Sequence, residues 1–491
     1  MRDAIVLVDP PYDRVAPGYG FVRHVTNRAP ALGLLHLAAI AREHGYEPSI
    51  IESDAEDLDE AAVVRRIVAR APRYVGITLF TVGVWAAARI AQGVKAALPD
   101  TTVIVGGPHV SSMGRETLAR FDCFDLAVVG EGEWALVELL RALGGGGDLG
   151  AISGLIWRDG GALRENPSRP IPQDLDDLPM PAWDLLPGFP HAYPPAIYDY
   201  PRGPTATLAA SRGCPFHCKF CDTSTFGARV RAYSPEKVVE MIRHLHDRWS
   251  VRHVLFVDDL FLASRTRVTA FCERLLATGP RISWTCTARV DTVKPDILAL
   301  MRRAGCWEIS FGLETGSNEL LAKMDKAARV ERSEQAVGWT HAAGIRTKGL
   351  FMLGYPGETP ETIRATRDFV RRIPLDVMNL SKFTPYPGSP IYLDLYGTKI
   401  RPDHWKKMNG MNFVFAPDGM SIEELDRAYQ RLLLDFYRRR KVAGHYARLT
   451  LRHPAHLVRL ARFGLGYAGA KARSLAAGRR GLLAEEAEPL H

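Results

Sequence analysis

Three cysteines within a single short loop are the residues with the clearest chemical meaning in this sequence. Cys214, Cys218 and Cys221 follow the spacing C-x3-C-x-Φ-C, and Phe220 occupies the aromatic position. Iron–sulfur clusters normally take four cysteine ligands, so a loop that offers three leaves one iron open, as a catalytic metal site requires. A zinc site would need a fourth Cys or His at another spacing, and we interpret His217 as a spacer. The loop therefore predicts an iron–sulfur cluster with one open iron.

The remaining composition indicates a cytoplasmic enzyme. Seven cysteines in 491 residues are too few for a disulfide framework. The chain contains no run of about 18 apolar residues, the length that would span a membrane. The first nine residues form a short apolar run that already carries acids, which predicts a first strand and not a signal peptide. The length predicts two or three domains.

Apolar runs alternate with helical windows over the first 145 residues. The expected strands are 4–8, 48–51, 74–78, 102–105 and 126–129. Strands separated by helices predict βαβ units in a doubly wound parallel sheet, whose ligands bind at the carboxyl ends of the strands. Small residues follow three of these strands: Thr78, Thr81, Gly106, Gly107, Gly130 and Gly132. Glycines at these positions would let the backbone approach a large ligand closely.

A second alternating series runs from residue 205 to about 395, and six βα units predict an incomplete TIM-type barrel. The cysteine loop follows its first strand. Polar or small residues end the next four strands: Asp258 and Asp259, Arg289, Glu314, and Gly354. Because the active sites of such barrels gather at the carboxyl ends of the strands, we expect these residues to lie near the cysteines.

Over roughly residues 1 to 430 the chain resembles the cobalamin-binding radical S-adenosylmethionine (SAM) enzymes. The resemblance implies that a 4Fe-4S cluster on the three cysteines binds SAM through its open iron and cleaves it to a 5'-deoxyadenosyl radical. Among the implied SAM contacts, Asp258 or Asp259 would bind the ammonium group and Arg289 the carboxylate. Glu314 would bind the ribose hydroxyls and the backbone at Gly354 the adenine edge, with Phe220 also among the SAM contacts.

The N-terminal half resembles the cobalamin-binding domain of that family, in which the small residues after strands three and four line the pocket for the nucleotide tail. It departs from the methionine synthase pattern, because Asp9-Pro-Pro-Tyr-Asp-Arg carries no histidine to ligate cobalt. His24 and His36 are too loosely placed to serve, so we expect cobalamin without a protein histidine on cobalt. A Rossmann-like domain without a cofactor is the alternative. A nicotinamide site is disfavoured because no Gly-x-Gly-x-x-Gly follows the first strand.

The two cofactors together imply chemistry at an unactivated carbon of a small-molecule or lipid-like substrate, with methyl transfer as the leading hypothesis. Oxidative cyclisation, as in the anaerobic porphyrin ring cyclases, is the alternative within the family. A non-catalytic sensor is disfavoured, since it would need no open iron. An external one-electron donor such as flavodoxin or ferredoxin is implied.

The net charge of +8 is concentrated near the end of the chain. Residues 438–480 contain twelve Lys and Arg and no acid, and the remainder holds 51 basic against 55 acidic residues. Such a basic amphipathic segment can lie on an anionic membrane surface, or its helices can pack on the body with a solvated basic face. We find no nucleic-acid recognition module.

The expected fold class is α/β. It comprises a Rossmann-like cobalamin-binding domain (1–145), a Pro/Gly/aromatic-rich linker (146–204), a partial (β/α)6 radical SAM barrel (205–400) and a basic helical segment (401–491).

Overall fold

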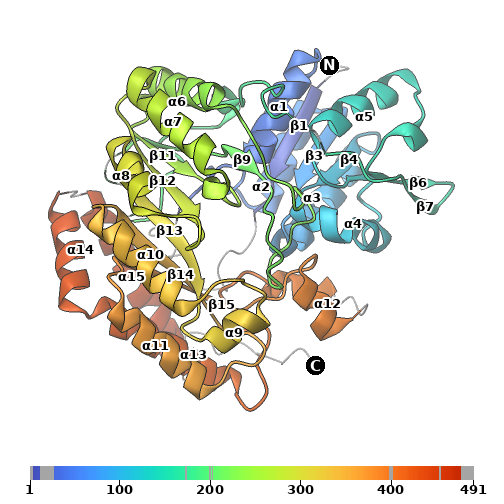
Figure 1. Ribbon diagram of the computed structural model, residues 1–491. Helices are drawn as coiled ribbons and strands as arrows, with labels where there is room; N and C mark the ends of the chain where they lie inside the picture. Colours follow the sequence, from blue (N-terminus) through green and yellow to red (C-terminus); the bar gives the residue numbers. More distant parts are fainter. Residues whose placement is uncertain are drawn as a thin grey trace.

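The computed structural model describes residues 4–11, 27–171, 174–197, 199, 201, 203–397, 402–452 and 455–476. They form an N-terminal α/β unit, a curled parallel sheet with its own helices, and a group of C-terminal helices (Figure 1). His24, most of the segment that follows Asp9, and the last basic residues of the chain lie outside the described residues.

The N-terminal sheet has the order β2-β1-β3-β4-β5-β6-β7. Its strands are β1 (Ala4–Asp9), β2 (Glu47–Glu52), β3 (Tyr74–Thr78), β4 (Thr102–Gly106), β5 (Leu126–Val128), β6 (Leu155–Asp159) and β7 (Ala162–Glu165). The first five pair in parallel in the doubly wound order 2-1-3-4-5, which confirms the five expected strands. The hairpin β6–β7 continues the sheet in antiparallel orientation, within the segment expected to be a linker.

Helices cover both faces of this sheet because its strands are apolar on both sides. Ile5 and Leu7 of β1 share a core with α1 (Leu32–Glu43) and α5 (Glu133–Gly145). Val6 and Val8 belong to a second core, formed with the three helices of the opposite face. Those helices are α2 (Glu60–Arg70), α3 (Val84–Ala97) and α4 (Pro108–Arg120).

The second sheet has six parallel strands in the order β8-β11-β12-β13-β14-β15. They are β8 (Thr205–Leu208), β11 (His253–Phe256), β12 (Ser283–Ala288), β13 (Cys306–Glu314), β14 (Arg346–Leu353) and β15 (Val377–Lys382). The first and last strands do not pair with each other, so the predicted incomplete barrel is confirmed. The main covering helices are α6 (Pro235–Trp249), α7 (Arg265–Thr278), α8 (Pro295–Arg303), α10 (Val330–Ala342) and α11 (Pro360–Arg372). Two shorter helices, α9 (Asn318–Lys323) and α12 (Pro390–Tyr396), follow β13 and β15.

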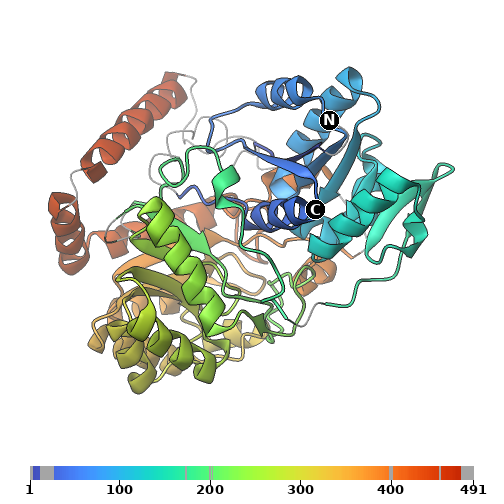
Figure 2. The same ribbon diagram turned by 90° about the horizontal axis from the view of Figure 1, so that it is seen from above.

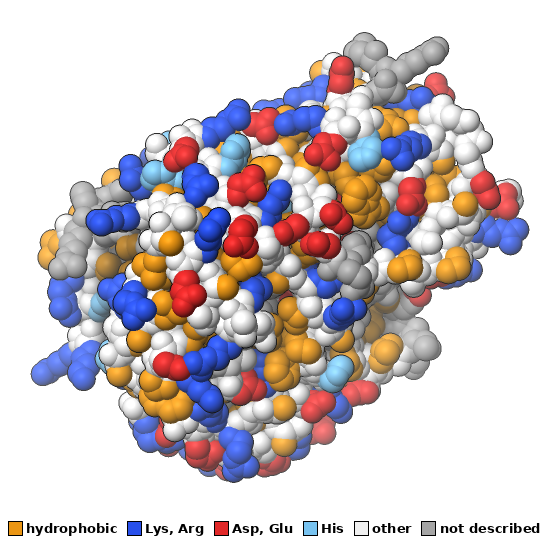
Figure 3. Space-filling view, turned by 45° about the horizontal axis from the view of Figure 1, so that its top comes forward, with side chains coloured by type: hydrophobic (Ala, Val, Ile, Leu, Met, Phe, Trp, Pro, Cys, Tyr) orange, Lys and Arg blue, Asp and Glu red, His pale blue; other side chains and the backbone are white. Residues whose placement is uncertain are grey.

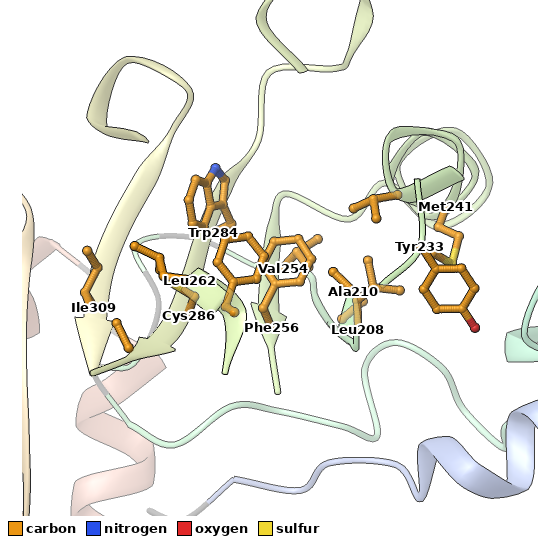
Figure 4. Packing of buried hydrophobic residues seen from close by; sticks show 14 of the residues in the cluster. Leu208, Ala210, Tyr233, Met241, Val254, Phe256, Leu262, Trp284, Cys286 and Ile309 are labelled. Atoms are coloured by element: carbon orange, nitrogen blue, oxygen red, sulfur yellow. The ribbon is translucent and has the colours of Figure 1, made fainter. Parts of the chain in front are cut away.

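An aromatic core lies between this sheet and its helices (Figure 4). Phe256 on β11 and Trp284 on β12 have ring centroids 5.8 Å apart. Cys286 on β12 is buried in the same cluster, as are Cys272 and Cys306. These three thiols act as small apolar side chains.

The chain returns to the N-terminal unit after β15. Trp405, in the short helix η6 (Pro402–Lys407), is fully buried, and its ring centroid lies 4.5 Å from that of His109. The Trp85 indole N–H donates to the Pro402 carbonyl at 2.9 Å. Trp405 thereby becomes part of the core of the N-terminal sheet.

Three helices end the described chain: α13 (Ile422–Tyr437), α14 (Arg440–Arg452) and α15 (Ala455–Ala476). α13 packs on β15, where the Tyr437 hydroxyl donates to the Met378 carbonyl at 2.8 Å. None of the helices within the described ranges is both long and apolar enough to cross a membrane.

Candidate cofactor and substrate site

One cavity of about 1130 Å³ receives residues from both α/β units. This exceeds the ~300–1,000 Å³ typical of a pocket for one small molecule, and so leaves room for more than one ligand. Its walls include the three cysteines of the loop and Asp259. From the N-terminal unit they include all six small residues singled out in the sequence: Thr78, Thr81, Gly106, Gly107, Gly130 and Gly132. The structure thus brings together predicted residues that lie far apart in the chain.

The backbone holds the cysteine loop in a tight shape. The Cys221 amide donates to the Cys218 carbonyl at 3.0 Å, and the Lys219 amide to the Met324 carbonyl at 2.9 Å. Gly213, just before the first cysteine, has φ +86°, and a Cβ there would lie 2.4 Å from the Arg229 carbonyl oxygen. Only glycine fits this position without a backbone shift.

The three thiols of the loop differ in their pKa: burial raises that of Cys214, and the hydrogen bond with Cys218 raises that of Cys221. A hydrogen bond from the Cys221 thiol, together with the charges of Lys326 and Arg289, lowers the pKa of Cys218 to about 6. The Arg289 guanidinium Nη1 lies 3.9 Å from the Cys218 Sγ. No three His, Cys, Asp or Glu side chains in the described part of the chain are gathered as ligands of a single metal ion. An iron–sulfur cluster, however, takes its thiolates on separate irons, so three thiols along one cavity wall fit it.

The two acids that follow β11 have different environments. Asp258 is buried, where it accepts from the Ala210 amide at 3.0 Å and from the Ser211 hydroxyl. Burial raises its pKa to about 6. Asp259 is exposed to the cavity and accepts from the Gly213 amide at 2.9 Å. Asp258 therefore supports the start of the cysteine loop, and Asp259 faces the ligand space.

Arg289 and Glu314 do not line the cavity, but they belong to a charged cluster that adjoins Cys218. The Arg289 guanidinium binds Asp291 at 2.9 Å and the Lys326 carbonyl at 2.8 Å, and it lies 3.5 Å from the Phe216 ring centroid. The Lys326 ammonium donates to Glu314 at 2.7 Å. Lys326 was not identified from the sequence, because no motif marks a lysine whose partner is brought close only by the fold.

Gly354 and Phe220 also lie outside the cavity wall. Gly354 has φ +92°, and its amide donates to the Glu358 carboxylate at 2.7 Å. Phe220 packs beside a small apolar cluster around Leu320, and the Lys326 ammonium lies 5.5 Å from its ring centroid. Phe216, two residues after Cys214, is the aromatic residue of the loop that lines the cavity.

The two glycines at the end of β4, Gly106 and Gly107, have different surroundings. Gly107 has φ +100°, and a Cβ there would lie 2.9 Å from the Thr78 hydroxyl and 3.1 Å from the Leu79 amide nitrogen. It is therefore needed by the packing of the chain itself. A Cβ at Gly106 would meet nothing closer than the Val128 carbonyl oxygen at 3.6 Å, so the space at Gly106 is left open for a ligand.

One apolar part of the cavity, the apolar slot, lies between the sheet and two of its helices. Its floor is formed by residues of four neighbouring strands: Leu7, Gly76, Ile104 and Val128. Helices α1 and α5 contribute Leu34 and Leu136 to its walls. An apolar slot between sheet and helices fits the planar base of a nucleotide tail, so the residues present fit cobalamin.

Two histidines line this cavity. Both ring nitrogens of His109 are engaged, by the hydroxyls of Thr81 and Thr117 at 3.1 Å each. His36 on α1 is buried, and its Nδ1 has no hydrogen-bond partner among the described residues. Burial lowers its pKa to about 4, so the ring is neutral at pH 7. His36 presents an unused polar group toward a bound ligand.

A buried ionic cluster links the two units beside the cavity. Arg212, two residues before Cys214, binds Glu131 at 2.5 Å and Glu133 at 2.6 Å. Arg231 also binds Glu131. Burial alone would raise the pKa of Glu133, but the charge and hydrogen bond of Arg212 outweigh it and hold that pKa below its ordinary value. The cluster ties the turn after β5 to the base of the cysteine loop.

Comparisons with known proteins agree with this geometry. Residues 208–370 match the model of the Radical SAM superfamily, and residues 19–140 match the B12 binding domain. The chain is 32% identical over 440 residues to an uncharacterized methyltransferase, PH0819, of Pyrococcus horikoshii, covering 89% of this chain and 93% of that protein. The chain belongs to the cobalamin-binding radical SAM enzymes. Its cofactors are a 4Fe-4S cluster, SAM and cobalamin.

Two further proteins are similar to this radical SAM enzyme, one in sequence and one in fold. It is 29% identical over 417 residues to the anaerobic magnesium-protoporphyrin IX monomethyl ester cyclase of Rubrivivax gelatinosus, covering 83% of this chain and 74% of the cyclase. Its fold matches the radical SAM methyltransferase TsrM of Kitasatospora setae with a TM-score of 0.65, at 21% identity over 82% of this chain and 80% of TsrM. The sequence relatives thus include a methyltransferase and a cyclase, and the likeness to TsrM shows the fold alone.

Proposed function

We propose that this enzyme transfers a methyl group to an unactivated carbon of a small-molecule or lipid-like substrate. The single observation that carries the proposal is that the three cysteines and the small residues of the N-terminal strands open onto one cavity. When bound there, the cluster, SAM and cobalamin supply the one-electron cleavage of SAM and a transferable methyl group.

The cysteine side of the cavity is proposed to bind the cluster and SAM. Cys214, Cys218 and Cys221 would hold the cluster, and Asp259 would receive the SAM ammonium group, because Asp258 is committed to the loop backbone. This assignment requires no movement of the buried acid.

The charged cluster beside Cys218 is proposed to orient the rest of SAM. Glu314 would bind the ribose hydroxyls and Arg289 the carboxylate, with Lys326 as the residue that positions Glu314. The turn that begins at Gly354 would contact adenine through its backbone. Phe220 would support the loop from the apolar cluster next to it.

The glycine side is proposed to bind cobalamin. Thr78, Thr81, Gly106, Gly107, Gly130 and Gly132 would surround it. The tail would enter the apolar slot, where His36 can hydrogen-bond with it, and cobalt would carry no protein histidine. We assign the hairpin β6–β7 to this first domain, which moves the proposed boundary with the linker to about residue 165. The barrel and the C-terminal segment keep their proposed limits.

Four exposed apolar side chains support an apolar substrate. Phe80 follows β3, Val257 follows β11, and Tyr386 and Met411 belong to the segment after the barrel. All four line the cavity. Large apolar side chains left exposed around a cavity favour a ligand that covers them with apolar surface of its own.

The test begins with anaerobic purification of the protein with cobalamin supplied, followed by iron content, a visible spectrum and reductive SAM cleavage with flavodoxin or ferredoxin as electron donor. Iron together with a bound corrinoid and deoxyadenosine formation is expected. A product that gains one CH₂ supports methyl transfer. Oxidative cyclisation, as the similarity to the cyclase suggests, would instead give a product that has lost hydrogen and gained no carbon.

A further inference from the structure

The last helix of the described chain is only loosely covered by the body of the enzyme. α15 follows α14, and its Arg459 guanidinium donates to the Pro195 carbonyl at 2.9 Å. None of its described side chains is fully buried. Figure 2 shows α15 as the long red helix at the left edge of the molecule, with one side turned away from the rest. Its outward side therefore faces solvent.

That outward side is apolar. The helix advances about 100° per residue, and six exposed residues fall within about 100° of arc. They are Leu457, Val458, Ala461, Leu465, Ala468 and Ala472. Leu457 is 51% exposed, Val458 55% and Leu465 76%. A surface helix normally turns its apolar stripe to the core, and α15 turns one to the solvent.

The charge around this stripe indicates what covers it. Twelve Lys and Arg and no acid lie between residues 438 and 480. Exposed Arg462 lies just beyond the edge of the stripe, and Arg448 on α14 is also exposed. On the face drawn in Figure 3, by contrast, acidic and basic side chains are interspersed. An apolar stripe with an exposed arginine near one edge, on a helix whose sequence contains no acid, matches a helix that lies in the interface of an anionic bilayer.

We propose that α14 and α15 dock this enzyme on an anionic lipid surface. α15 would lie parallel to the membrane, with Leu457, Val458 and Leu465 at the headgroup–acyl boundary and the neighbouring arginines on lipid phosphates. Leu451 of α14, which is 80% exposed, would enter the same layer. The proposal concerns a surface outside the cavity and does not depend on the reaction catalysed there.

The test is co-sedimentation of the full-length protein with vesicles. Vesicles of phosphatidylcholine and phosphatidylglycerol in equal parts should bind it, and vesicles of phosphatidylcholine alone should not. Leu465→Glu should weaken binding at least about tenfold, because it removes apolar burial and adds a repelled charge. Arg462→Glu should weaken it and reduce its salt dependence.

Leu276→Glu on α7 is the matched control, since Leu276 is 50% exposed on a helix far from the stripe in the chain. It should bind vesicles like the unchanged protein. Equal loss in Leu276→Glu and Leu465→Glu would overturn the proposal, and so would the absence of phosphatidylglycerol-dependent binding. Light scattering would also overturn the proposal if it showed that the unchanged protein is a dimer and that Leu465→Glu dissociates it. The stripe would then contact a second copy of the chain.

Discussion

The two parallel sheets that meet at the cavity end in different kinds of residue. In the N-terminal sheet, β3 and β4 end in the small, uncharged residues Thr78 and Gly106. The barrel strands end in charged residues such as Asp259, Arg289 and Glu314. The first arrangement suits a bulky ligand held by close backbone contact, and the second suits a small ligand held by its charges. Ligand binding at the N-terminal strand ends should be lost when side-chain volume is added, and ligand binding at the barrel strand ends when a charge or a thiol is removed.

The largest effect is expected on the barrel side. Cys214→Ala removes one of three thiols and should abolish cluster binding and SAM cleavage, while cobalamin binding persists. Iron content measures cluster binding, deoxyadenosine formation measures SAM cleavage, and the corrinoid spectrum measures cobalamin binding. Cys123→Ala is the control, because Cys123 is a half-buried thiol outside the loop. If Cys214→Ala still cleaves SAM at the full rate, the three thiols are not the ligands of the cluster.

On the N-terminal side, added volume should act selectively. Gly106→Trp has room for its Cβ and would fill the ligand space, so cobalamin binding should weaken at least about 1,000-fold, or about 4 kcal/mol. The cluster should remain. Gly107→Trp is a poorer probe, because its backbone conformation and its contacts with Thr78 and Leu79 would be disrupted as well. Unchanged corrinoid content in a folded Gly106→Trp protein would contradict the assignment.

A third substitution tests the connection between the two sides. Arg212→Met leaves Glu133 buried without its partner and should destabilise the enzyme by about 3 kcal/mol. Thermal unfolding near neutral pH is the measurement. Because the pKa of Glu133 is depressed, the contribution of the pair is complete at neutral pH and is lost as the pH falls through that depressed value.

The control for this pair is Arg89→Met, since the ion pair between Arg89 and Glu60 is exposed and should cost less than about 1 kcal/mol. Adding Glu133→Leu to Arg212→Met should recover part of the loss by removing the stranded charge. If the double variant is less stable than Arg212→Met alone, the stability does not come from this pair.

The smallest effect concerns an acid behind the barrel strand ends. Burial raises the pKa of Glu358 to about 7. Stability should therefore fall as the pH rises from about 4.5, where the unfolded carboxyl ionises, through about 7, where the folded carboxyl ionises. Glu358→Gln keeps an acceptor for the Gly354 amide and cannot ionise. The melting temperature of the unchanged protein relative to this variant should thus be lower at about pH 8 than at about pH 5; a pH-independent difference would refute the raised pKa.

Much of the fold could be predicted from the sequence, because most strands contain short runs of apolar or β-branched residues, such as Ala4-Ile-Val-Leu-Val8, with helical windows between them. The hairpin β6–β7 could not, since β7 is mostly exposed and lies in a Gly-rich segment without clear alternation. The curled sheet followed from counting six βα units and from the position of the cysteine loop after the first strand.

The candidate site was partly predictable for a related reason. The cysteines and glycines could be found because their roles depend on local spacing or local backbone conformation. Arg212, Glu133 and Lys326 could not, because each is defined by a partner from another segment that only the tertiary fold brings near. The sequence also could not show which of Asp258 and Asp259 faces the cavity. The two are adjacent in the chain, but the fold buries Asp258 and exposes Asp259.

The burial of Trp405 in the N-terminal core has a consequence for synthesis. Ribosomes add about 5–20 residues per second, so the N-terminal sheet emerges on the order of tens of seconds before the residue that completes its core. During that interval the apolar surface beside His109 and Trp85 is uncovered. The nascent chain therefore exposes this apolar surface until Trp405 has been added, and a fragment that stops before residue 402 would leave it exposed permanently.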